Sequence, residues 1–263
     1  MLKRKQKKLV IGNWKMNPAT VAHAKRIIVA TKKTARILEH TSVVMCPPFP
    51  FITYALPRGG AAAHVKDPKV GAQDVSFEEA GPFTGDVSAA MLADMGLSYV
   101  IVGHSERRKT GETNDIVARK AIAAAAGGLV AVVCVGEETR DTDGAYLDFI
   151  KEQIKSSLVG FSRKAVTDGK LVIAYEPIWA IGAKDAMTPG AIHEIGIFIK
   201  KVLSDIYGQD EATTVLILYG GSVNFRNAAD IIAMGDVDGL LVGRESVNQP
   251  GFSELLKAVD MVK

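Results

Sequence analysis

Short apolar runs recur along the chain, and most are followed by a longer segment with helical spacing of its apolar residues. The runs are rich in Val, Ile and Leu, are bounded by Gly, Pro or polar residues, and are too short for buried helices. They predict strands at 9–12, 42–45, 69–72, 99–102, 130–135, 171–174, 215–218 and 239–242. The longer segments predict helices at 19–38, 115–126, 146–158, 188–207, 228–234 and 252–262. Residues that favour helix ends support several of these: Asn114 precedes one helix, Thr188-Pro189 opens another, and Gly208 closes it.

The repeated alternation of strand and helix indicates parallel strands joined by crossover helices. Such strands are buried on both faces, which explains why the runs are continuously apolar rather than alternating. Eight units within 263 residues favour a closed barrel over an open sheet. Because no linker or change in composition divides the chain, we predict a single-domain α/β fold, a (β/α)8 barrel of eight parallel strands spanning 1–263, in which residues 1–8 form a basic N-terminal tail.

Composition excludes several classes of protein. The chain is 48% hydrophobic and 23% charged, so it can bury a core and is not disordered. Lys and Arg number 32 against 29 Asp and Glu, and this balance (+3) points to neither a nucleic-acid nor a membrane partner. The basic residues at 3–8 precede too short an apolar run for a secretory signal. Cys46 and Cys134 lie in apolar strands outside any CxxC pair, which suits reduced thiols and a cytoplasmic protein.

Common cofactor and metal motifs are absent from the sequence. The first strand is followed by GNWK at 12–15 rather than by a dinucleotide-binding GxGxxG, and no GxxxxGK[ST] phosphate loop occurs. His193 and Glu194 begin a possible HExxH, but Ile197 occupies the place of its second histidine. We therefore expect neither a hydride-carrying cofactor nor a metal.

Polar residues and glycines directly follow five of the predicted strands. In a barrel of parallel strands, the residues past the carboxyl ends surround the active site. These residues are Asn13 and Lys15 after the first strand, His104, Ser105, Glu106, Arg107 and Arg108 after the fourth, Glu176 after the sixth, Gly220, Gly221 and Ser222 after the seventh, and Gly243 and Arg244 after the eighth. One lysine, one histidine and one glutamate thus converge from three strands.

Each of these residues also has a purely structural interpretation. Lys15 could begin a surface loop, His104 could be a satisfied core histidine, and Glu176 could belong to a buried ion pair. An imidazole at the start of a helix is pushed toward its neutral form. The loops after the last two strands of such barrels commonly bind phosphate through backbone N–H groups. Taken together, the residues favour proton abstraction next to a carbonyl in a small sugar phosphate.

The same segments resemble the triosephosphate isomerase family, in one register from about residue 9 to residue 259. The matching segments are 12–17 (GNWKMN), 71–73 (GAQ), 82–85 (PFTG), 102–108 (VGHSERR), 175–182 (YEPIWAIG) and 219–223 (YGGSV). The resemblance implies interconversion of dihydroxyacetone phosphate and D-glyceraldehyde 3-phosphate through an enediolate, without a cofactor, in glycolysis and gluconeogenesis.

The resemblance also implies roles for individual residues. Glu176 is the base, neutral His104 donates to the enediolate, Lys15 supplies positive charge, Asn13 orients the substrate oxygen, and Glu106 supports Lys15 and His104. Residues 177–187 form a lid, and the phosphate is bound by Gly182, Ser222 and Gly243 together with Asn13 and Lys15. Thr84 lies in the loop that enters the neighbouring subunit, so a homodimer is expected; Phe83 makes the tip of that loop apolar.

Three segments depart from the family pattern. Residues 183–187 read AKDAM where the family usually has TGKTA, and Asn224-Phe225 replaces the usual Lys-Pro. Arg244 replaces a second glycine after the eighth strand; its N–H can still bind phosphate, while its side chain either adds a charge there or points outward. Arg244 and the altered residues 183–187 motivate one alternative, an isomerase of a four-carbon ketose phosphate (a tetrulose phosphate). A separate alternative is a barrel that binds phosphate ligands or partners without catalysis.

Overall fold

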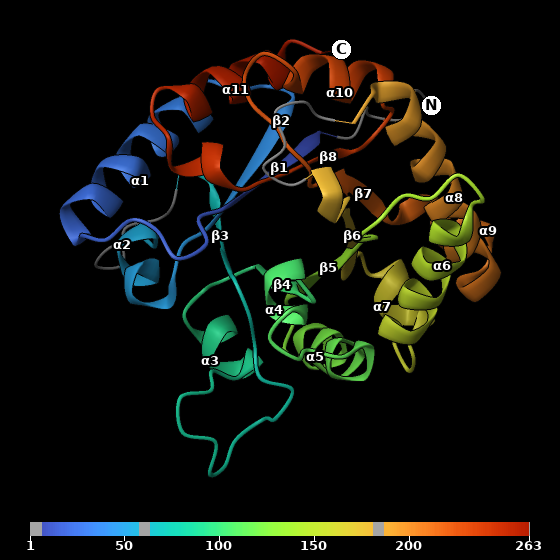
Figure 1. Ribbon diagram of the computed structural model, residues 1–263. Helices are drawn as coiled ribbons and strands as arrows, with labels where there is room; N and C mark the ends of the chain where they lie inside the picture. The colour runs from blue at the N-terminus through green and yellow to red at the C-terminus, as the bar shows by residue number, and fades with distance from the viewer. Residues whose placement is uncertain (1–6, 58–63, 181–186, 263) are drawn as a thin grey trace.

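Parallel strands form a closed barrel in this computed structural model, which describes residues 7–57, 64–180 and 187–262. The barrel follows sequence order from β1 to β8, and β8 pairs with β1 (Figure 1). The strands are β1 (Lys8–Asn13), β2 (Thr41–Cys46), β3 (Lys69–Ala72), β4 (Tyr99–Val102), β5 (Val130–Val135), β6 (Leu171–Tyr175), β7 (Leu216–Tyr219) and β8 (Gly239–Val242). All eight predicted strands are therefore confirmed in these described residues, within one or two residues at their ends.

Side chains of each strand alternate between two apolar layers. Leu9 and Ile11 of β1 lie in a cluster made only of strand residues, which includes Val44 and Val132 and fills the barrel. Val10, between them, belongs to a second cluster that the helices share. Because both faces are buried, neither set of positions can be polar, and this accounts for the unbroken apolar runs.

Helices surround the strands on the outside of the barrel (Figure 1). The longer ones are α1 (Val21–Ala35), α5 (Asn114–Ala126), α6 (Ala145–Ser157), α8 (Pro189–Tyr207), α10 (Ala228–Met234) and α11 (Gly251–Asp260). As predicted, Thr188 caps α8 by accepting from the N–H of Ala191, and Gly208 ends that helix. The cap of α5 is Thr113 rather than Asn114, because the Thr113 hydroxyl accepts from the N–H of Ile116.

Several short helices lie where the sequence predicts none. They are α2 (Ile52–Ala55), α3 (Ala89–Asp94), α7 (Arg163–Thr167) and α9 (Gln209–Thr214), together with the 3-10 turns η1 (Phe49–Phe51), η2 (Ile178–Ala180) and η3 (Arg244–Val247). A further short helix, α4 (Ser105–Arg108), begins where the sequence indicates a helix's first turn after His104. Segments this short do not complete enough turns to display a helical period. α2 and α3 lie in the crossovers from β2 to β3 and from β3 to β4, and α4 and η3 lie at the carboxyl ends of β4 and β8.

The prediction that the basic tail extends to Lys8 is wrong at that residue. Lys8 already belongs to β1, since its N–H donates to the carbonyl of His40 at 2.9 Å and its Nζ lies 3.3 Å from the carbonyl of Val237. Residues 1–6 lie outside the described residues.

Candidate active site

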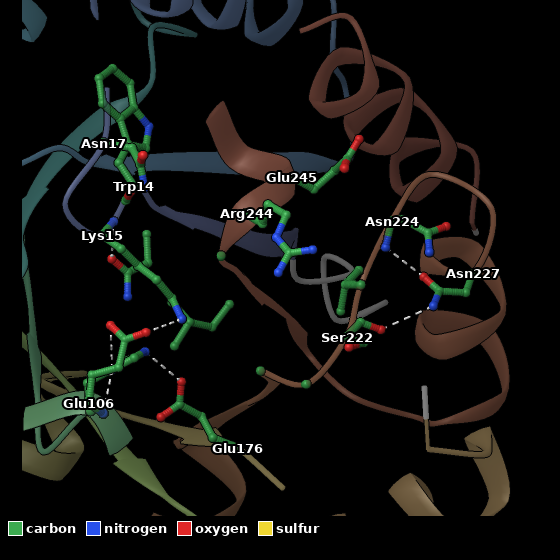
Figure 2. Close-up of a pocket in the computed structure, with 17 residues that line it drawn as sticks. Trp14, Lys15, Asn17, Glu106, Glu176, Ser222, Asn224, Asn227, Arg244 and Glu245 are labelled. Atoms are coloured by element: carbon green, nitrogen blue, oxygen red, sulfur yellow. Dashed lines mark hydrogen bonds and ion pairs between the residues drawn. The ribbon is translucent and has the colours of Figure 1, made fainter. Parts of the chain in front are cut away.

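The carboxyl ends of the strands surround a cavity of about 450 Å3 (Figure 2). Its lining residues come from the carboxyl ends of β1 and β8 and from the segments after β1, β4, β6, β7 and β8. The cavity brings together residues that the sequence predicts to form the site: Asn13, Lys15, His104, Glu106, Glu176, Gly220, Gly221, Ser222, Gly243 and Arg244. Lys15, His104 and Glu176 therefore lie on the same rim of the barrel. Gly182 lies outside the described residues, as does most of the predicted lid.

The backbone of Lys15 adopts an unusual conformation at the end of β1. Its φ of 54° is in the left-handed region, which residues with a Cβ seldom adopt. The N–H of Lys15 donates to Asn13 Oδ1 at 3.0 Å, and its carbonyl accepts from Gln73 Nε2 at 2.9 Å. Gln73 Nε2 also donates to the carbonyl of Cys46 at 2.8 Å. The ends of β1 and β2 and the loop after β3 thus hold Lys15 in a costly conformation, as is common at functional sites.

Glu106 connects Lys15 to His104. The Lys15 Nζ lies 2.6 Å from Glu106 Oε1, and the N–H of Glu106 donates to His104 Nδ1 at 3.2 Å. Glu106 is mostly exposed, so the ion pair contributes at most about 1 kcal/mol to stability. Its effect is to position the ammonium group over the cavity.

His104 and Glu176 form a buried pair. Because Nδ1 of His104 accepts a hydrogen bond, the proton of the neutral ring is assigned to Nε2, which lies 3.1 Å from Glu176 Oε1. Burial lowers the pKa of His104, but the Glu176 carboxylate raises it more, and the net pKa is above the ordinary 6.5. This direction is opposite to the one expected from the helix start alone, because the carboxylate lies within hydrogen-bond distance.

Glu176 directly follows β6 and is 3% exposed. Burial raises the pKa of this carboxyl, whereas the charge and hydrogen bond of His104 and the N–H of Ser105, 3.3 Å from Oε2, lower it. The net pKa is below 4.5, so the group is a carboxylate at neutral pH. A buried, ionised carboxylate next to an imidazole is able to act as a general base.

A network of hydrogen bonds and ion pairs, which the sequence did not predict, holds the loop before His104. Glu112 Oε2 accepts from the N–H of Gly103 at 3.1 Å, and the Glu112 carboxylate pairs with the buried Lys120. Arg108 Nε donates to the carbonyl of Gly103 at 2.7 Å. The sequence does contain a signal for this network, because Lys120 lies on the apolar face of a predicted helix, where a lysine is buried only if it is paired.

A second residue that the sequence did not single out is Glu137, which follows Gly136 after the end of β5. Its Oε1 accepts from the hydroxyl of Tyr175 and from Trp179 Nε1, both at 2.9 Å. Glu137 could have been found by the rule that identified Glu176, since it also follows the carboxyl end of a strand. Its bonds tie β5 to the end of β6 and to η2, where the predicted lid begins.

The loops after β7 and β8 form the side of the cavity that lies across from Glu106 (Figure 2). Asn227 Nδ2 donates to the carbonyl of Ser222 at 3.1 Å, and Asn227 Oδ1 accepts from the N–H of Asn224 at 2.8 Å. Ser222 Oγ donates to the carbonyl of Ala180 at 2.8 Å, which joins this loop to η2. The two bonds of Asn227 hold the loop after β7 around Asn224.

No group of three or more His, Cys, Asp or Glu residues in the described ranges is arranged to hold a metal ion. The helices of these ranges include none with the length and apolar character needed to cross a membrane.

Comparisons with known proteins agree with this geometry. The sequence model of the triosephosphate isomerase family matches residues 8–259. Triosephosphate isomerase from Acetivibrio thermocellus is 41% identical over 96% of this chain and 98% of its own, and that from Endomicrobium trichonymphae is 38% identical over the same shares. The crystal structure of triosephosphate isomerase from Bartonella henselae aligns with a TM-score of 0.80 and 32% identity, over 96% of this chain and 98% of that one. With a family match across nearly its whole length and a barrel whose rim unites Lys15, His104 and Glu176, this chain belongs to the triosephosphate isomerase family.

Proposed function

We propose that this protein interconverts dihydroxyacetone phosphate and D-glyceraldehyde 3-phosphate by proton transfer through an enediolate, as a step of glycolysis and gluconeogenesis. The observation that supports this most strongly is the pairing of Glu176 with His104 at 3.1 Å in a cavity that Lys15 also lines. Abstraction of a carbon-bound proton builds negative charge on the neighbouring oxygen, and preorganised donors stabilise that charge. The side chains present supply a base, a donor and a cation for that step.

Glu176 takes the role of the base. Its Oε1 accepts the Nε2 proton of His104, and that single proton cannot serve the carboxylate and a substrate oxygen together. A substrate whose carbonyl oxygen accepts from Nε2 therefore displaces the carboxylate, which turns toward the carbon-bound proton. When the Glu176 carboxylate loses the hydrogen bond from His104, its pKa rises, so it is more basic when it takes the carbon-bound proton.

His104, Lys15, Asn13 and Glu106 act on the developing charge. His104 donates from Nε2 to the enediolate oxygen, and the Lys15 ammonium balances the charge. Asn13 holds the backbone of Lys15 through Oδ1, so it sets the position of the cation as well as that of the substrate. Glu106 keeps Lys15 directed at the cavity through their 2.6 Å ion pair.

The phosphate group occupies the side of the cavity formed by the loops after β7 and β8. Ser222 and Gly243 line this side, and glycine at 243 lets the backbone approach the ligand; a Cβ there would lie 3.2 Å from Lys15 Cε. Gly182, by resemblance, adds a further backbone donor. Ser246 Oγ donates to the carbonyls of Gly243 and Asn13, at 2.7 and 3.2 Å, which fixes the turn after β8 against β1.

A coupled isomerase assay on the purified protein tests the function. Glu176→Asp withdraws the carboxylate by about 1 Å and is expected to lower kcat by about 10²-fold or more. Arg226→Ala, a surface change on the loop after β7, is the control and should keep wild-type kcat. An unchanged kcat in Glu176→Asp would remove that residue from its role.

Two further measurements address the alternatives. Exchange of solvent hydrogen into dihydroxyacetone phosphate excludes a barrel that only binds its ligand. A specificity constant that is higher for a tetrulose phosphate than for the triose phosphates would reassign the substrate.

Our proposal includes a homodimer built on the loop between β3 and α3, which contains Thr84. Figure 1 shows this loop projecting away from the barrel, and its Phe83 is 41% exposed. Met16, next to Lys15, is 94% exposed, and Phe49 is 40% exposed; such large apolar side chains favour burial against a partner. Sedimentation should give the mass of two chains for the wild type and of one for Phe83→Asp. A single-chain mass for the wild type at micromolar concentration would contradict the dimer.

We further propose that the chain folds as one domain and acts in the cytoplasm. The family match runs without interruption over residues 8–259. Cys46 and Cys134 are both free and buried, as suits a reducing compartment. A single cooperative unfolding transition, and cell fractionation, test these two points.

A further inference from the structure

We infer that the side chain of Arg244 is a specificity-determining residue that binds the phosphate group of the substrate through its guanidinium. The inference rests on the proposed function, because it assigns a side chain to one end of the proposed substrate. Arg244 departs from the pattern of the family that the sequence resembles, which usually has glycine at this position.

Arg244 is well placed for this contact. It directly follows Gly243 at the end of β8 and lines the same cavity as Lys15 and Ser222. In Figure 2 its side chain extends into the space that the cavity residues enclose, between Lys15 and Asn224. The bonds of Ser246 to Gly243 and Asn13 hold the turn from which it projects.

The other charged side chains of the cavity already have partners. Lys15 pairs with Glu106 at 2.6 Å, and His104 with Glu176 at 3.1 Å. The carboxylate of Glu245 accepts from Asn248 Nδ2 at 3.2 and 3.3 Å rather than from Arg244. Across residues 7–57, 64–180 and 187–262, the Arg244 guanidinium has neither a hydrogen-bond nor an ion-pair partner, so its donors are available to a ligand.

The charge balance of the cavity indicates an anion as that ligand. Since Glu106 offsets the charge of Lys15, a phosphate group bound only by Lys15 and backbone N–H groups would be poorly neutralised. A guanidinium presents parallel N–H donors that match two phosphate oxygens. The amides of Asn224 and Asn227 do not replace it, because Asn227 is bonded within the loop and neither residue is charged.

The experiment compares Arg244→Ala and Arg244→Lys with the wild type. A hydrogen bond to a charged group corresponds to about a 10- to 100-fold change in affinity, and exposure of the arginine to salt favours the lower part of that range. For Arg244→Ala we expect KM for the triose phosphates and Kd for inorganic phosphate, measured by calorimetry, to rise by this factor, while kcat changes less than about threefold. With D-glyceraldehyde, which has no phosphate, kcat/KM should be unchanged. Arg244→Lys should restore part of the affinity.

Arg226→Ala is the matched control, because its guanidinium carbon lies 5.4 Å from the ring centroid of Phe225 and the residue does not line the cavity. It should leave both KM and the phosphate Kd unchanged. A loss in Arg244→Ala that is equal for D-glyceraldehyde and the triose phosphates overturns the inference, and so does an unchanged phosphate Kd.

Failure of the proposed function has a different signature. A wild type that binds phosphate but does not isomerise triose phosphates, with weaker phosphate binding in Arg244→Ala, rejects the function and retains the inference. An active wild type whose Arg244→Ala variant keeps the same KM and phosphate Kd rejects only the inference.

Discussion

The Nε2 of His104 lies 3.1 Å from Oε1 of Glu176, so each residue sets the protonation of the other. Both are buried, at 5% and 3% exposure, and burial by itself disfavours the charged form of each. The carboxylate raises the pKa of His104, and the imidazole lowers the pKa of Glu176. The two groups therefore titrate as a coupled pair.

Neutralising the carboxylate should reverse the shift at His104. In Glu176→Gln the largest opposing influences that remain are burial and the positive charge of Lys15, both of which lower the pKa. We expect the pKa of His104 to fall from above 6.5 to below it, as measured by NMR titration of its ring in the full-length protein. Glu245→Gln, whose carboxylate bonds to Asn248, is the control and should not move it. A His104 pKa that stays above 6.5 in Glu176→Gln would contradict the assigned cause.

The same pair should give stability a particular pH dependence. The pKa of Glu176 is lowered below 4.5 in the fold, so its contribution is present above pH 4.5 and is lost as the pH falls through the folded pKa. The pKa of His104 is raised above 6.5, so its contribution is present below pH 6.5 and is lost as the pH rises through the folded pKa. The unfolding free energy of the wild type should therefore exceed that of Glu176→Gln by the largest amount between pH 4.5 and 6.5. Urea unfolding of both proteins over a range of pH measures this difference. A difference that is flat with pH would show that the pair is not coupled.

Gly220 leaves room for the base. A Cβ at this position would lie 2.9 Å from Glu176 Cγ and 3.3 Å from the carbonyl of Tyr175. Gly220→Ala should push the carboxylate aside, and a shift of about 1 Å lowers kcat by about 10²-fold. Gly190→Ala in α8 is the matched control: nothing lies within 4 Å of its Cβ, so kcat should be unchanged and stability should rise by about 0.4–1 kcal/mol. Equal kcat values in the two variants would show that Glu176 tolerates the added methyl group.

Lys120 should contribute strongly to stability. It is 6% exposed and pairs with Asp74 at 2.7 Å and with Glu112, which also accepts from the N–H of Gly103. Lys120→Met leaves these carboxylates with less positive charge, and breaking a buried pair costs about 3–5 kcal/mol. Urea unfolding measures the loss. Lys164→Met, which removes an exposed ion pair to Asp168, is the control and should cost about 0.5 kcal/mol or less. A similar small loss for Lys120→Met would mean that water replaces the missing ammonium.

The pattern of apolar residues along the chain predicted most of the fold, because a barrel requires each strand to be buried on both faces. Val10 packs against helices while Leu9 and Ile11 fill the barrel, so every position of the run must be apolar. Short elements such as α3 and α7 escaped prediction, because a helix of five or six residues is too short to show a period.

The candidate site also has features that the sequence predicts and features that it does not. The order of residues along the chain was enough to predict that Lys15, His104 and Glu176 lie on one rim, because residues past parallel strands share an edge. How these groups act on one another became visible only in three dimensions. The Nε2 of His104 faces the Glu176 carboxylate, Glu112 and Lys120 hold the loop before His104, and Arg244 extends into the cavity. These relationships depend on side-chain directions and on burial between elements far apart in the chain, and a one-dimensional pattern contains neither.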